Sequence, residues 1–525
     1  MPRHHQVASL QSLSVNAVGD FVVSLSSQIL INVKNASDPL KSAHVLKSWI
    51  IKLQYYLADS IPYFLYNSVA FKVLQSVKDL IEKTKKTYDH HTPMSVFLME
   101  MNVVVSLTET ILTPNLKNID FSVWPKMMRY VLYKHLAQLT GLEVLNLGSC
   151  TGGWRTADND RCVIEGITNM KNLRSLCLCF DCSDTIVQNI GENCPQLQVL
   201  DITSSRSVTD RSIVSLLKCN QLRELQLHRT SVSVEGYAQL LTNLKRLQDL
   251  GRCDEFGAVI KYIHHNYQVT GPLGLRKIQT RDLSTENLRL LVDMCPNLEY
   301  ISLFHDEQTS DLTILAMLDN LKELKLLSCA FYTDFLKQLL EIRGINLTSL
   351  HLEHVEEIDL DAIVSISQYC PLLKNLVLYN CDFIDQNSSY VDMFNVKPFR
   401  YLERIFWVVD CALTHLEFLL LNALNIKYIH LGSSTGITHA SMAKILANNP
   451  MKRLEELRIL YSSDMNICTV NMLLENCTNL RVLSELESWQ GITMEELKEF
   501  RTYIKINNYD LDISPTLSYY TCYSQ

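Results

Sequence analysis

Leucines recur along this chain in a fixed pattern, Leu-x-x-Leu-x-Leu-x-x-Cys, with a period of about 26 residues. Three copies are nearly complete; they run from Leu142 to Cys150, from Leu321 to Cys329 and from Leu373 to Cys381. Alternate residues within the pattern are apolar, as in a strand with one buried face. A polar turn and then apolar residues at helical spacing follow, as in Ile213, Leu216 and Leu217. The unit therefore reads as strand, turn and helix.

The first apolar position of the unit can be followed through most of the chain. It falls at Leu116, Leu142, Leu173, Leu197, Leu222, Leu247, Leu298, Leu321, Leu347, Leu373, Leu402, Ile426, Leu454 and Leu480. The gap between Leu247 and Leu298 spans about two periods, which predicts a degenerate unit near Leu275 and Ile278. One unit cannot bury its own apolar face, so the units must stack. We expect an α/β solenoid of about 15 repeats over residues 113–513, a horseshoe with parallel strands on the concave face and helices outside.

Short polar residues mark the expected starts of several helices. Thr209 or Asp210 can accept backbone N–H bonds as an N-cap, and similar starts occur at Thr333-Asp334, Thr438 and Thr493. These positions follow the turn of their units, where the repeat predicts a helix.

Composition excludes several classes of protein. The chain has 525 residues, of which 47% are hydrophobic and 20% charged, so it can bury a continuous core. The net charge of -8 and the lack of a long basic run disfavour nucleic acid as a partner. The first residues do not resemble a signal peptide, and we expect no apolar run of the roughly 18 residues that span a membrane. We therefore expect no membrane partner and a cytoplasmic or nuclear location, where thiols stay reduced.

The repeat explains most of the 16 cysteines as small buried residues. Those at the end of the intervening helix are Cys194, Cys219, Cys295, Cys370 and Cys477. Cys177, Cys179 and Cys182 form a tighter cluster, but zinc sites usually need a second pair of ligands and none matches. We expect Cys177 and Cys179 to face the concave side, Cys182 to lie in the turn, and no metal to be bound.

Other candidate chemistry is sparse. The histidine pairs His4-His5, His90-His91 and His264-His265 are adjacent in sequence, so each pair points in two directions on regular structure. No phosphate-binding loop, dinucleotide-binding glycine motif or nucleophile elbow occurs. We expect a protein that is not an enzyme and needs no cofactor.

Two segments resemble the cysteine-containing leucine-rich-repeat family. They are Cys194-Pro195-Gln-Leu197-Gln-Val-Leu200 and Cys370-Pro371-Leu-Leu373-Lys-Asn-Leu376-Val-Leu378-Tyr-Asn-Cys381. The resemblance covers about three quarters of the chain. Members of this family are often substrate receptors of cullin-RING ubiquitin ligases, which directs attention to the part of the chain without repeats.

Residues 1–112 lack the repeat. Amphipathic patterns predict helices over residues 43–57, 69–85 and 95–112. The first repeat needs an end cap to cover its core, so one interpretation of this segment is a cap with no further role.

A short motif near the start suggests a more specific role. Residues 9–18, Ser-Leu-Gln-Ser-Leu-Ser-Val-Asn-Ala-Val, resemble the BC box that docks Elongin C. On a helix, Leu10, Ser14 and Val18 share one face, with Leu13 and Ala17 beside them and Ser9 before them. A leucine there can fill an apolar pocket of a partner, and a small residue allows close approach. Ser14 stands where the family usually has cysteine.

A second motif follows at residues 61–69 and resembles a cullin 2 box. It begins Ile61-Pro62 and includes Leu65, and the proline is expected in the first turn of a helix, where it costs no hydrogen bond. The order and spacing of the two motifs resemble receptors of the Zyg/Zer type, without their armadillo domain. The resemblance implies Elongin C with Elongin B, and cullin 2, as partners.

Two alternatives remain open. Residues from Ile61-Pro62 to Leu80 could form the first helices of an F-box, which would imply Skp1 and cullin 1 instead. No Cys-x-x-Trp-type ending follows before Leu116, and an F-box would leave the motif at residues 9–18 unexplained. The other alternative is a non-enzymatic interaction scaffold without a ligase.

The variable strand positions predict where a protein substrate would bind. In x-Leu-x-Leu-x the x residues face the concave side, and in the C-terminal half they are rich in aromatic residues. The predicted contact residues are Tyr300, Phe304, His351, Tyr379, Phe406, Tyr428 and Arg458. Aromatic residues and Arg are common anchors of interfaces. The longer linker 383–400 and the tail 514–525 could instead cover this face.

Overall fold

The computed structural model describes residues 3–36, 38–88, 93–148, 157–268, 271–281, 283–304, 311–384, 397–410 and 412–515. Cys150, His90 and His91, most of the 383–400 linker and residues 516–525 of the tail lie outside these ranges. Contacts divide the chain into two compact units. The first is Ala8–Arg252; the second is Cys253–Gln525 together with Met1–Val7. The boundary falls where the repeat pattern weakens in the sequence.

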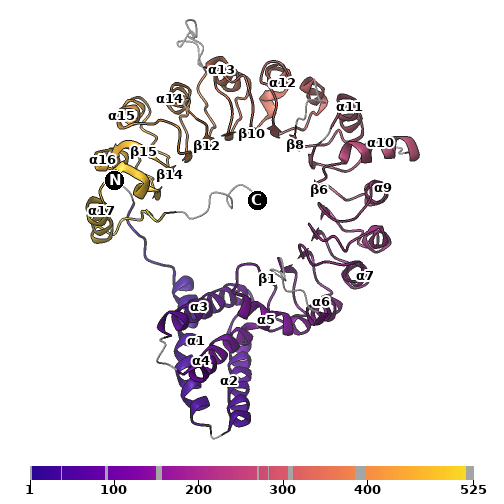
Figure 1. Cartoon of the computed structure of the whole chain (residues 1–525), viewed down its shortest axis with the longest axis vertical. Coiled ribbons are helices and arrows are strands. Elements are labelled where there is room, and N and C mark those ends of the chain that lie inside the picture. Colours follow the sequence, from indigo (N-terminus) through magenta and orange to yellow (C-terminus); the bar gives the residue numbers. More distant parts are fainter. Residues whose placement is uncertain are drawn as a thin grey trace. The chain divides into compact units, whose positions relative to one another are not determined.

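The first unit begins with helices that pack on one another (Figure 1). They are α1 (Leu10–Lys34), α2 (Pro39–Ser60), α3 (Tyr66–Thr87) and α4 (Met94–Ser106). The helices predicted at residues 43–57, 69–85 and 95–112 are thus present, the last one ending in a 3-10 turn, η1 (Leu107–Ile111). Gly19 allows α1 to approach α3, because a Cβ there would lie 2.6 Å from Ser76 Oγ.

Strand–turn–helix units follow in the same unit. The strands are β1 (Asn118–Asp120), β2 (Val144–Asn146), β3 (Ser175–Cys177), β4 (Val199–Asp201), β5 (Glu224–Gln226) and β6 (Asp249–Arg252). The helices are α5 (Lys126–Lys134), α6 (Ala157–Asn169), α7 (Asp184–Asn193), α8 (Ile213–Leu216) and α9 (Val234–Asn243). Neighbouring strands are parallel, and the central leucines align as Leu176↔Leu200 and Leu200↔Leu225. These leucines are fully buried, so the repeat pattern sets the register of the sheet.

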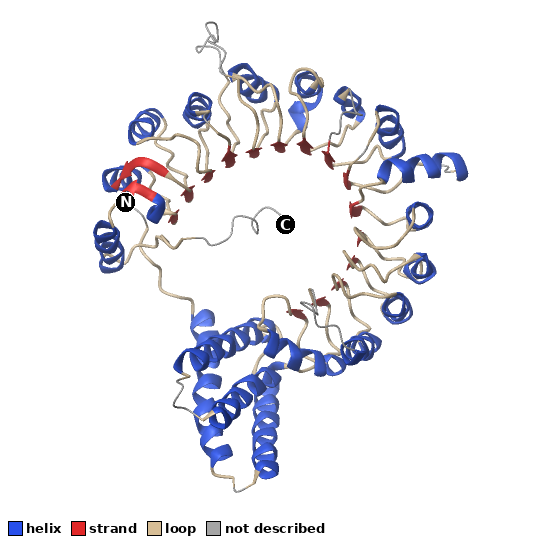
Figure 2. Ribbon diagram, in the orientation of Figure 1, coloured by secondary structure: helices blue, strands red, loops and turns tan. Residues whose placement is uncertain are grey.

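The second unit continues the same plan. Its main strands are β7 (Lys277–Thr280), β8 (Tyr300–Phe304), β9 (Glu323–Leu327), β10 (Ser349–Glu353), β11 (Asn375–Tyr379), β12 (Arg404–Val408), β13 (Tyr428–Leu431), β14 (Glu456–Ile459) and β16 (Val482–Ser484). The helices are α10 (Phe256–Asn266), α11 (Thr285–Met294), α12 (Leu336–Arg343), α13 (Leu360–Tyr369), α14 (Leu413–Asn422), α15 (His439–Asn448), α16 (Ile467–Asn476) and α17 (Met494–Ile506). A small sheet pairs β15 (Ser462–Asn466) with β17 (Trp489–Gly491). Within this unit the main strands line the inner side and the helices the outer side (Figure 2).

The predicted α/β solenoid with a helical N-terminal segment is confirmed. The degenerate unit exists as β7, with Leu275 and Ile278 both buried. Thr209, Thr438 and Thr493 accept N-cap hydrogen bonds from backbone N–H groups as predicted. The predicted cap at Thr333-Asp334 is wrong: α12 begins at Leu336.

The reason lies in other hydrogen bonds that occupy both side chains. The Thr333 hydroxyl donates to Glu357 Oε1, and Asp334 Oδ2 accepts from the backbone N–H of Ala330 at 2.7 Å. The residue before α12 is Phe335, in the left-handed region at a φ of 62°, and it makes no side-chain cap.

The first residues of the chain pair with the end of the second unit. His4 forms an antiparallel bridge with Tyr509, and its ring stacks on the Tyr509 ring at 5.1 Å. The N–H of His5 donates to Asn508 O at 2.9 Å, and the N–H of Asp510 donates to Arg3 O at 2.7 Å. These residues therefore belong to the C-terminal end of the solenoid, whereas the sequence pattern grouped them with the helical segment.

Two helical runs are long and apolar enough to cross a membrane by length and composition alone: Leu10–Lys34 and Met94–Ile111. The prediction that no segment reaches this limit is therefore wrong. The finding is weak evidence for a membrane, because core helices of soluble proteins pass the same test.

Candidate functional site

The predicted Elongin-binding motif forms the exposed start of α1. Ser9 is the N-cap, and its side chain accepts from the N–H of Ser12 at 3.1 Å. Leu10 is 80% exposed and Leu13 49% exposed. Ser14 and Ala17 are also exposed, while Val18 is half-buried. The first buried residue of α1 is Gly19, so two helical turns ahead of it leave their apolar face uncovered within this unit.

The second motif lies in the turn between α2 and α3. Ile61 is the C-cap of α2 and is half-buried, as is Leu65. Pro62 is exposed and precedes the first residue of α3, Tyr66, so it does not lie in the first turn of that helix as predicted. Its carbonyl instead accepts from the N–H of Leu65 at 2.9 Å and closes a turn, which starts the helix later.

Exposed aromatic residues near these motifs escaped the sequence analysis. Tyr63 and Phe64, inside the second motif, are 80% and 69% exposed and meet edge to face at 5.7 Å. Tyr55 and Tyr56 are exposed near the end of α2, and the Tyr56 ring lies 6.2 Å from that of Phe21 on α1. The signal was the pairing of adjacent aromatic residues at 55–56 and 63–64. These two exposed aromatic pairs are candidate docking residues.

The predicted substrate contacts lie on strands of the second unit. Tyr300 and Phe304 belong to β8, His351 to β10, Tyr379 to β11, Phe406 to β12, Tyr428 to β13 and Arg458 to β14. All except Phe406 are half-buried. Two aromatic rings carry an arginine: Arg281 lies 4.1 Å from the Phe304 ring centre and Arg404 lies 4.9 Å from that of Tyr428. The alternation of the repeat thus sorted these residues onto one face, as predicted.

Phe406 is a correction to the predicted contacts. It is only 7% exposed, because the Tyr379 ring stacks on it and the His430 ring packs on it at a tilt, with ring centres 6.3 Å and 4.6 Å away. Phe406 therefore offers little surface to a ligand. The sequence placed Phe406 on the predicted face, but it could not show that rings on the adjacent strands cover its side chain.

Glu353 on β10 is a paired charge on this face. It forms an ion pair with Lys325 Nζ at 3.3 Å and accepts a hydrogen bond from His351, whose Nε2 lies 3.5 Å away. The hydrogen bond from His351, with the charge of Lys325, lowers the pKa of Glu353 to about 2. Burial lowers the pKa of His351. Glu353 is therefore a carboxylate at neutral pH, held by Lys325 and His351.

His430 gives this face a measurable pH dependence. Burial against Phe406, with the positive charge of its register partner Arg458, lowers the pKa of His430 to about 4. In the unfolded chain the pKa returns to about 6.5. The unfolded state therefore binds the proton first, and stability present above pH 6.5 is lost as the pH falls toward 4.

We expect this histidine to reduce the free energy of unfolding by about 2 kcal/mol between pH 7 and pH 5. Urea unfolding monitored by Trp fluorescence at both pH values measures the change. His430→Phe keeps the stack on Phe406 and removes the titrating group, so it should lose less stability than the wild type over this interval. Equal losses in the two proteins would contradict the assignment.

A pocket of about 460 Å³ lies in the first unit between α3 and the first strands. It is lined by Asn67, Ala70, Phe71, Leu74, Leu116, Asn118, Ile119, Asp120, Val123, Trp124, Val144, Leu145, Asn146, Ser175 and Cys177. Phe71 and Trp124 pack at 5.5 Å, and the buried Trp124 Nε1 has no hydrogen-bond partner within the described ranges. The pocket combines apolar walls with a few polar groups, as ligand pockets do.

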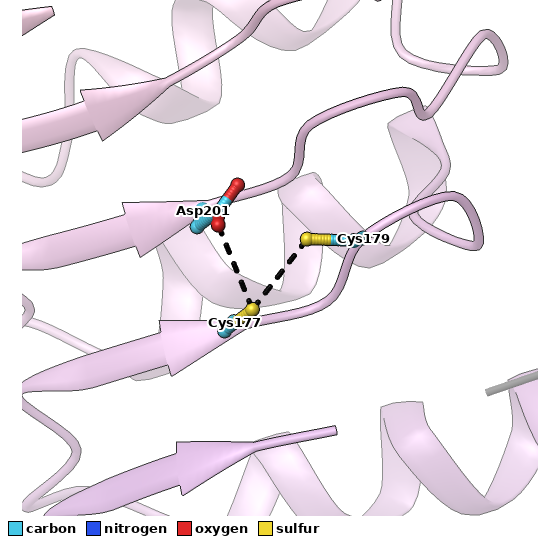
Figure 3. Close-up of side chains that lie close together, drawn as sticks. All are labelled: Cys177, Cys179 and Asp201. Atoms are coloured by element: carbon cyan, nitrogen blue, oxygen red, sulfur yellow. Dashed lines mark hydrogen bonds between the residues drawn. The ribbon is translucent and has the colours of Figure 1, made fainter. Parts of the chain in front are cut away.

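The cysteine cluster divides as predicted. Cys182 is buried in the turn, whereas Cys177, Cys179 and Asp201 have their ligand atoms within 4.8 Å of one another (Figure 3). The sulfurs of Cys177 and Cys179 are 3.5 Å apart, and Cys177 Sγ donates to Asp201 Oδ2 at 3.7 Å. The contact with Cys177, burial and the charge of Asp201 raise the pKa of Cys179.

The five cysteines at the helix ends have the structural role that the repeat predicts. Burial raises the pKa of Cys194, Cys295, Cys370 and Cys477 to about 12 and that of Cys219 to about 11. Such thiols are protonated and unreactive at neutral pH. Buried leucine or isoleucine residues on the main strands, buried cysteines beside several of them, and parallel strands backed by helices together decide the fold. The chain is a leucine-rich-repeat solenoid.

The chain is 31% identical over 166 residues to "F-box protein SKIP1" of Arabidopsis thaliana, a match covering 27% of the chain and 55% of the relative. The chain thus spans about half the length of that curated relative. No family model matches the sequence.

Solved structures resemble it at low identity. One is the leucine-rich-repeat protein LIC12759 of Leptospira interrogans, with 16% identity, a TM-score of 0.35 and coverage of 78% of this chain and 91% of that chain. Another is a chain of the Rad7 and Elc1 complex of yeast, with 15% identity, a TM-score of 0.38 and coverage of 60% of this chain and 86% of that chain.

Proposed function

We propose that this leucine-rich-repeat protein is a non-catalytic substrate receptor of a cullin-RING ubiquitin ligase. The observation that carries the proposal is the uncovered apolar start of α1, with Leu10, Leu13 and Ala17 exposed ahead of a repeat array. A leucine presented on a helix can enter an apolar groove of an adaptor. The repeats then offer the substrate-binding face. The similarity to a protein named as an F-box protein supports the same general class.

The adaptor we favour is Elongin C with Elongin B, which would link the protein to cullin 2. Leu10, Ser14 and Val18 follow one another at helical spacing, as a BC box requires. Tyr63 and Phe64 in the turn after α2 would then contact the cullin, in keeping with their exposure.

The second candidate adaptor is Skp1 with cullin 1. It is favoured by the printed name of the curated relative, an F-box protein. In that arrangement α2 and α3, rather than the start of α1, would bind Skp1.

Co-expression and purification of the full chain tests the proposal. Each sample contains Elongin B, Elongin C and Skp1, and the recovered adaptor is identified by mass spectrometry. Recovery of Elongin C supports the favoured adaptor, and recovery of Skp1 supports the second candidate adaptor. Recovery of neither would overturn the receptor proposal and leave an interaction scaffold.

The substrate-binding face is tested separately. We expect Tyr379→Ala with Tyr428→Ala to weaken substrate capture at least about tenfold, since interface tyrosines often contribute more than 1.4 kcal/mol. Phe406 is left intact because it is buried. Substrate capture is measured as the amount of each co-purified protein that is recovered with the wild type and with the variant when the ligase is inhibited.

The matched control is Tyr401→Ala, because Tyr401 is exposed but precedes β12. It should retain both substrate and adaptor. Unchanged capture by the double variant would contradict the predicted face.

A further inference from the structure

We propose that Cys177, Cys179 and Asp201 form a zinc-binding site with water as the fourth ligand. Cys177 ends β3 and Asp201 ends β4, and the two residues are partners in the parallel register. Their side chains therefore leave the sheet on the same side. Cys179 joins them because the residue between the two cysteines, Leu178, is buried in the core. The two thiols thus lie together on the face opposite the core (Figure 3).

Two ligand separations match a tetrahedral zinc site. With Zn–S bonds of about 2.3 Å, two sulfur ligands lie about 3.8 Å apart, and a sulfur and an oxygen about 3.6 Å apart. The observed separations are 3.5 Å between the sulfurs and 3.7 Å from Cys177 Sγ to Asp201 Oδ2. The third pair, Cys179 and Asp201, has its ligand atoms within 4.8 Å of each other, so rotation of the Cys179 side chain would bring all three atoms around one ion.

The backbone holds the ligands in place. The N–H of Leu178 donates to Asp201 O at 2.8 Å, and the N–H of Phe180 donates to Thr203 O at 2.9 Å. These bonds flank Cys179 on both sides. Phe180 has a φ of 70°, in the left-handed region, so the chain turns sharply just after the second thiol. The segment that carries both cysteines is therefore tied to the next repeat.

Asp201 is oriented by its own hydrogen bond. Its Oδ1 accepts from the N–H of Thr203 at 3.0 Å, and its Oδ2 points to the Cys177 sulfur. Such an outer hydrogen bond is the usual device that fixes a carboxylate ligand of a metal. One carboxylate oxygen thus serves the fold while the other is directed at the thiols.

Zinc is the metal that suits this donor set. Two thiolates favour zinc over magnesium or calcium, and a carboxylate oxygen is an accepted third ligand. Binding displaces two thiol protons, and the ion neutralises negative charges that would otherwise repel one another. All three residues are half-buried, so an ion can reach them and a water molecule can complete the shell.

The sequence predicted no zinc site because no second pair of ligands lies nearby in the chain. The third ligand comes instead from the neighbouring repeat. The inference does not depend on the proposed ligase role, because zinc binding and adaptor recovery are measured in separate experiments.

The test uses the full, untagged protein, reduced and stripped of metal. Titration with Co²⁺ should give one bound ion per chain and a thiolate-to-cobalt charge-transfer band, which Zn²⁺ then removes. Native mass spectrometry of the wild type after zinc addition should show one retained ion, a measurement that needs no variant. No retained zinc in the wild type would overturn the proposal.

Variants then locate the site. Cys177→Ser and Cys179→Ser should each weaken zinc binding at least about tenfold, as should Asp201→Asn. The control is Cys468→Ser, because Cys468 is an exposed thiol far from the cluster in sequence. Retention of the cobalt band in Cys177→Ser, or its loss in Cys468→Ser, would contradict the assignment. A disulfide between Cys177 and Cys179 that persists in reductant and prevents zinc binding would also overturn it.

Discussion

Replacing Leu10 and Ser14 together with Asp is expected to abolish recovery of Elongin C by this protein. Leu10 is 80% exposed, so the described residues of its unit leave its apolar side chain uncovered. Two carboxylates in an apolar groove would have to be desolvated without a counter-charge. We expect affinity to fall at least about 30-fold, the effect of losing about 2 kcal/mol at an interface anchor. Co-purification and surface plasmon resonance measure it.

Two matched variants sharpen this prediction. Leu40→Asp makes the same change at an equally exposed leucine in the first turn of α2, where a carboxylate is tolerated by the helix dipole. It should leave Elongin C binding intact. Ser14→Cys restores the residue usual in a BC box and should bind at least as well as the wild type. Equal loss in Leu40→Asp would indicate a general effect of charge, and retained binding in the double Asp variant would show that the motif is not used.

Replacing Trp407 with Ala is expected to lower the free energy of unfolding of the second unit by about 3–5 kcal/mol. Trp407 on β12 is fully buried and packs on Phe383, with ring centres 5.1 Å apart. Phe383 in turn packs on His415 of α14 at 4.9 Å. Loss of the indole would leave a cavity between the sheet and this helix. Urea unfolding monitored by circular dichroism measures the change.

Trp407→Phe separates cavity formation from polar burial. The buried Trp407 Nε1 has no hydrogen-bond partner among the residues that the structure describes. A phenylalanine removes this unsatisfied group and keeps part of the ring volume, so the loss should be smaller than for Ala. Losses of equal size in the two variants would show that ring packing does not dominate at this position.

The repeat pattern predicted the fold because its information is local. Leu350 and Leu376 are buried register partners, and each was identifiable from the alternation within its own repeat. The same spacing identified the buried cysteines at the helix ends. The start of α1 was also recognisable, since Leu10 and Ser14 lie four residues apart on one helical face.

Several features depended on neighbours that no single repeat specifies. Phe406 and Tyr379 are alike in the pattern, yet Phe406 is buried between two adjacent rings. Tyr63 and Phe64 were expected inside a helix that starts at Pro62, where they could have been core residues. The helix starts only at Tyr66, so both lie in the preceding turn and are exposed. The first residues joined the C-terminal unit through backbone hydrogen bonds, which leave no mark in the side-chain pattern.

The sequence by itself determined the strand–turn–helix unit, the leucines buried in the core, the structural cysteines and the segment without repeats. It did so because alternation and helical spacing act within one unit of the stack. Only the tertiary structure decided which aromatic residues stay exposed and which side chains from different repeats come together. Cys177 meets Asp201 because parallel pairing aligns the ends of two consecutive strands, and that register joins residues that lie in different repeats.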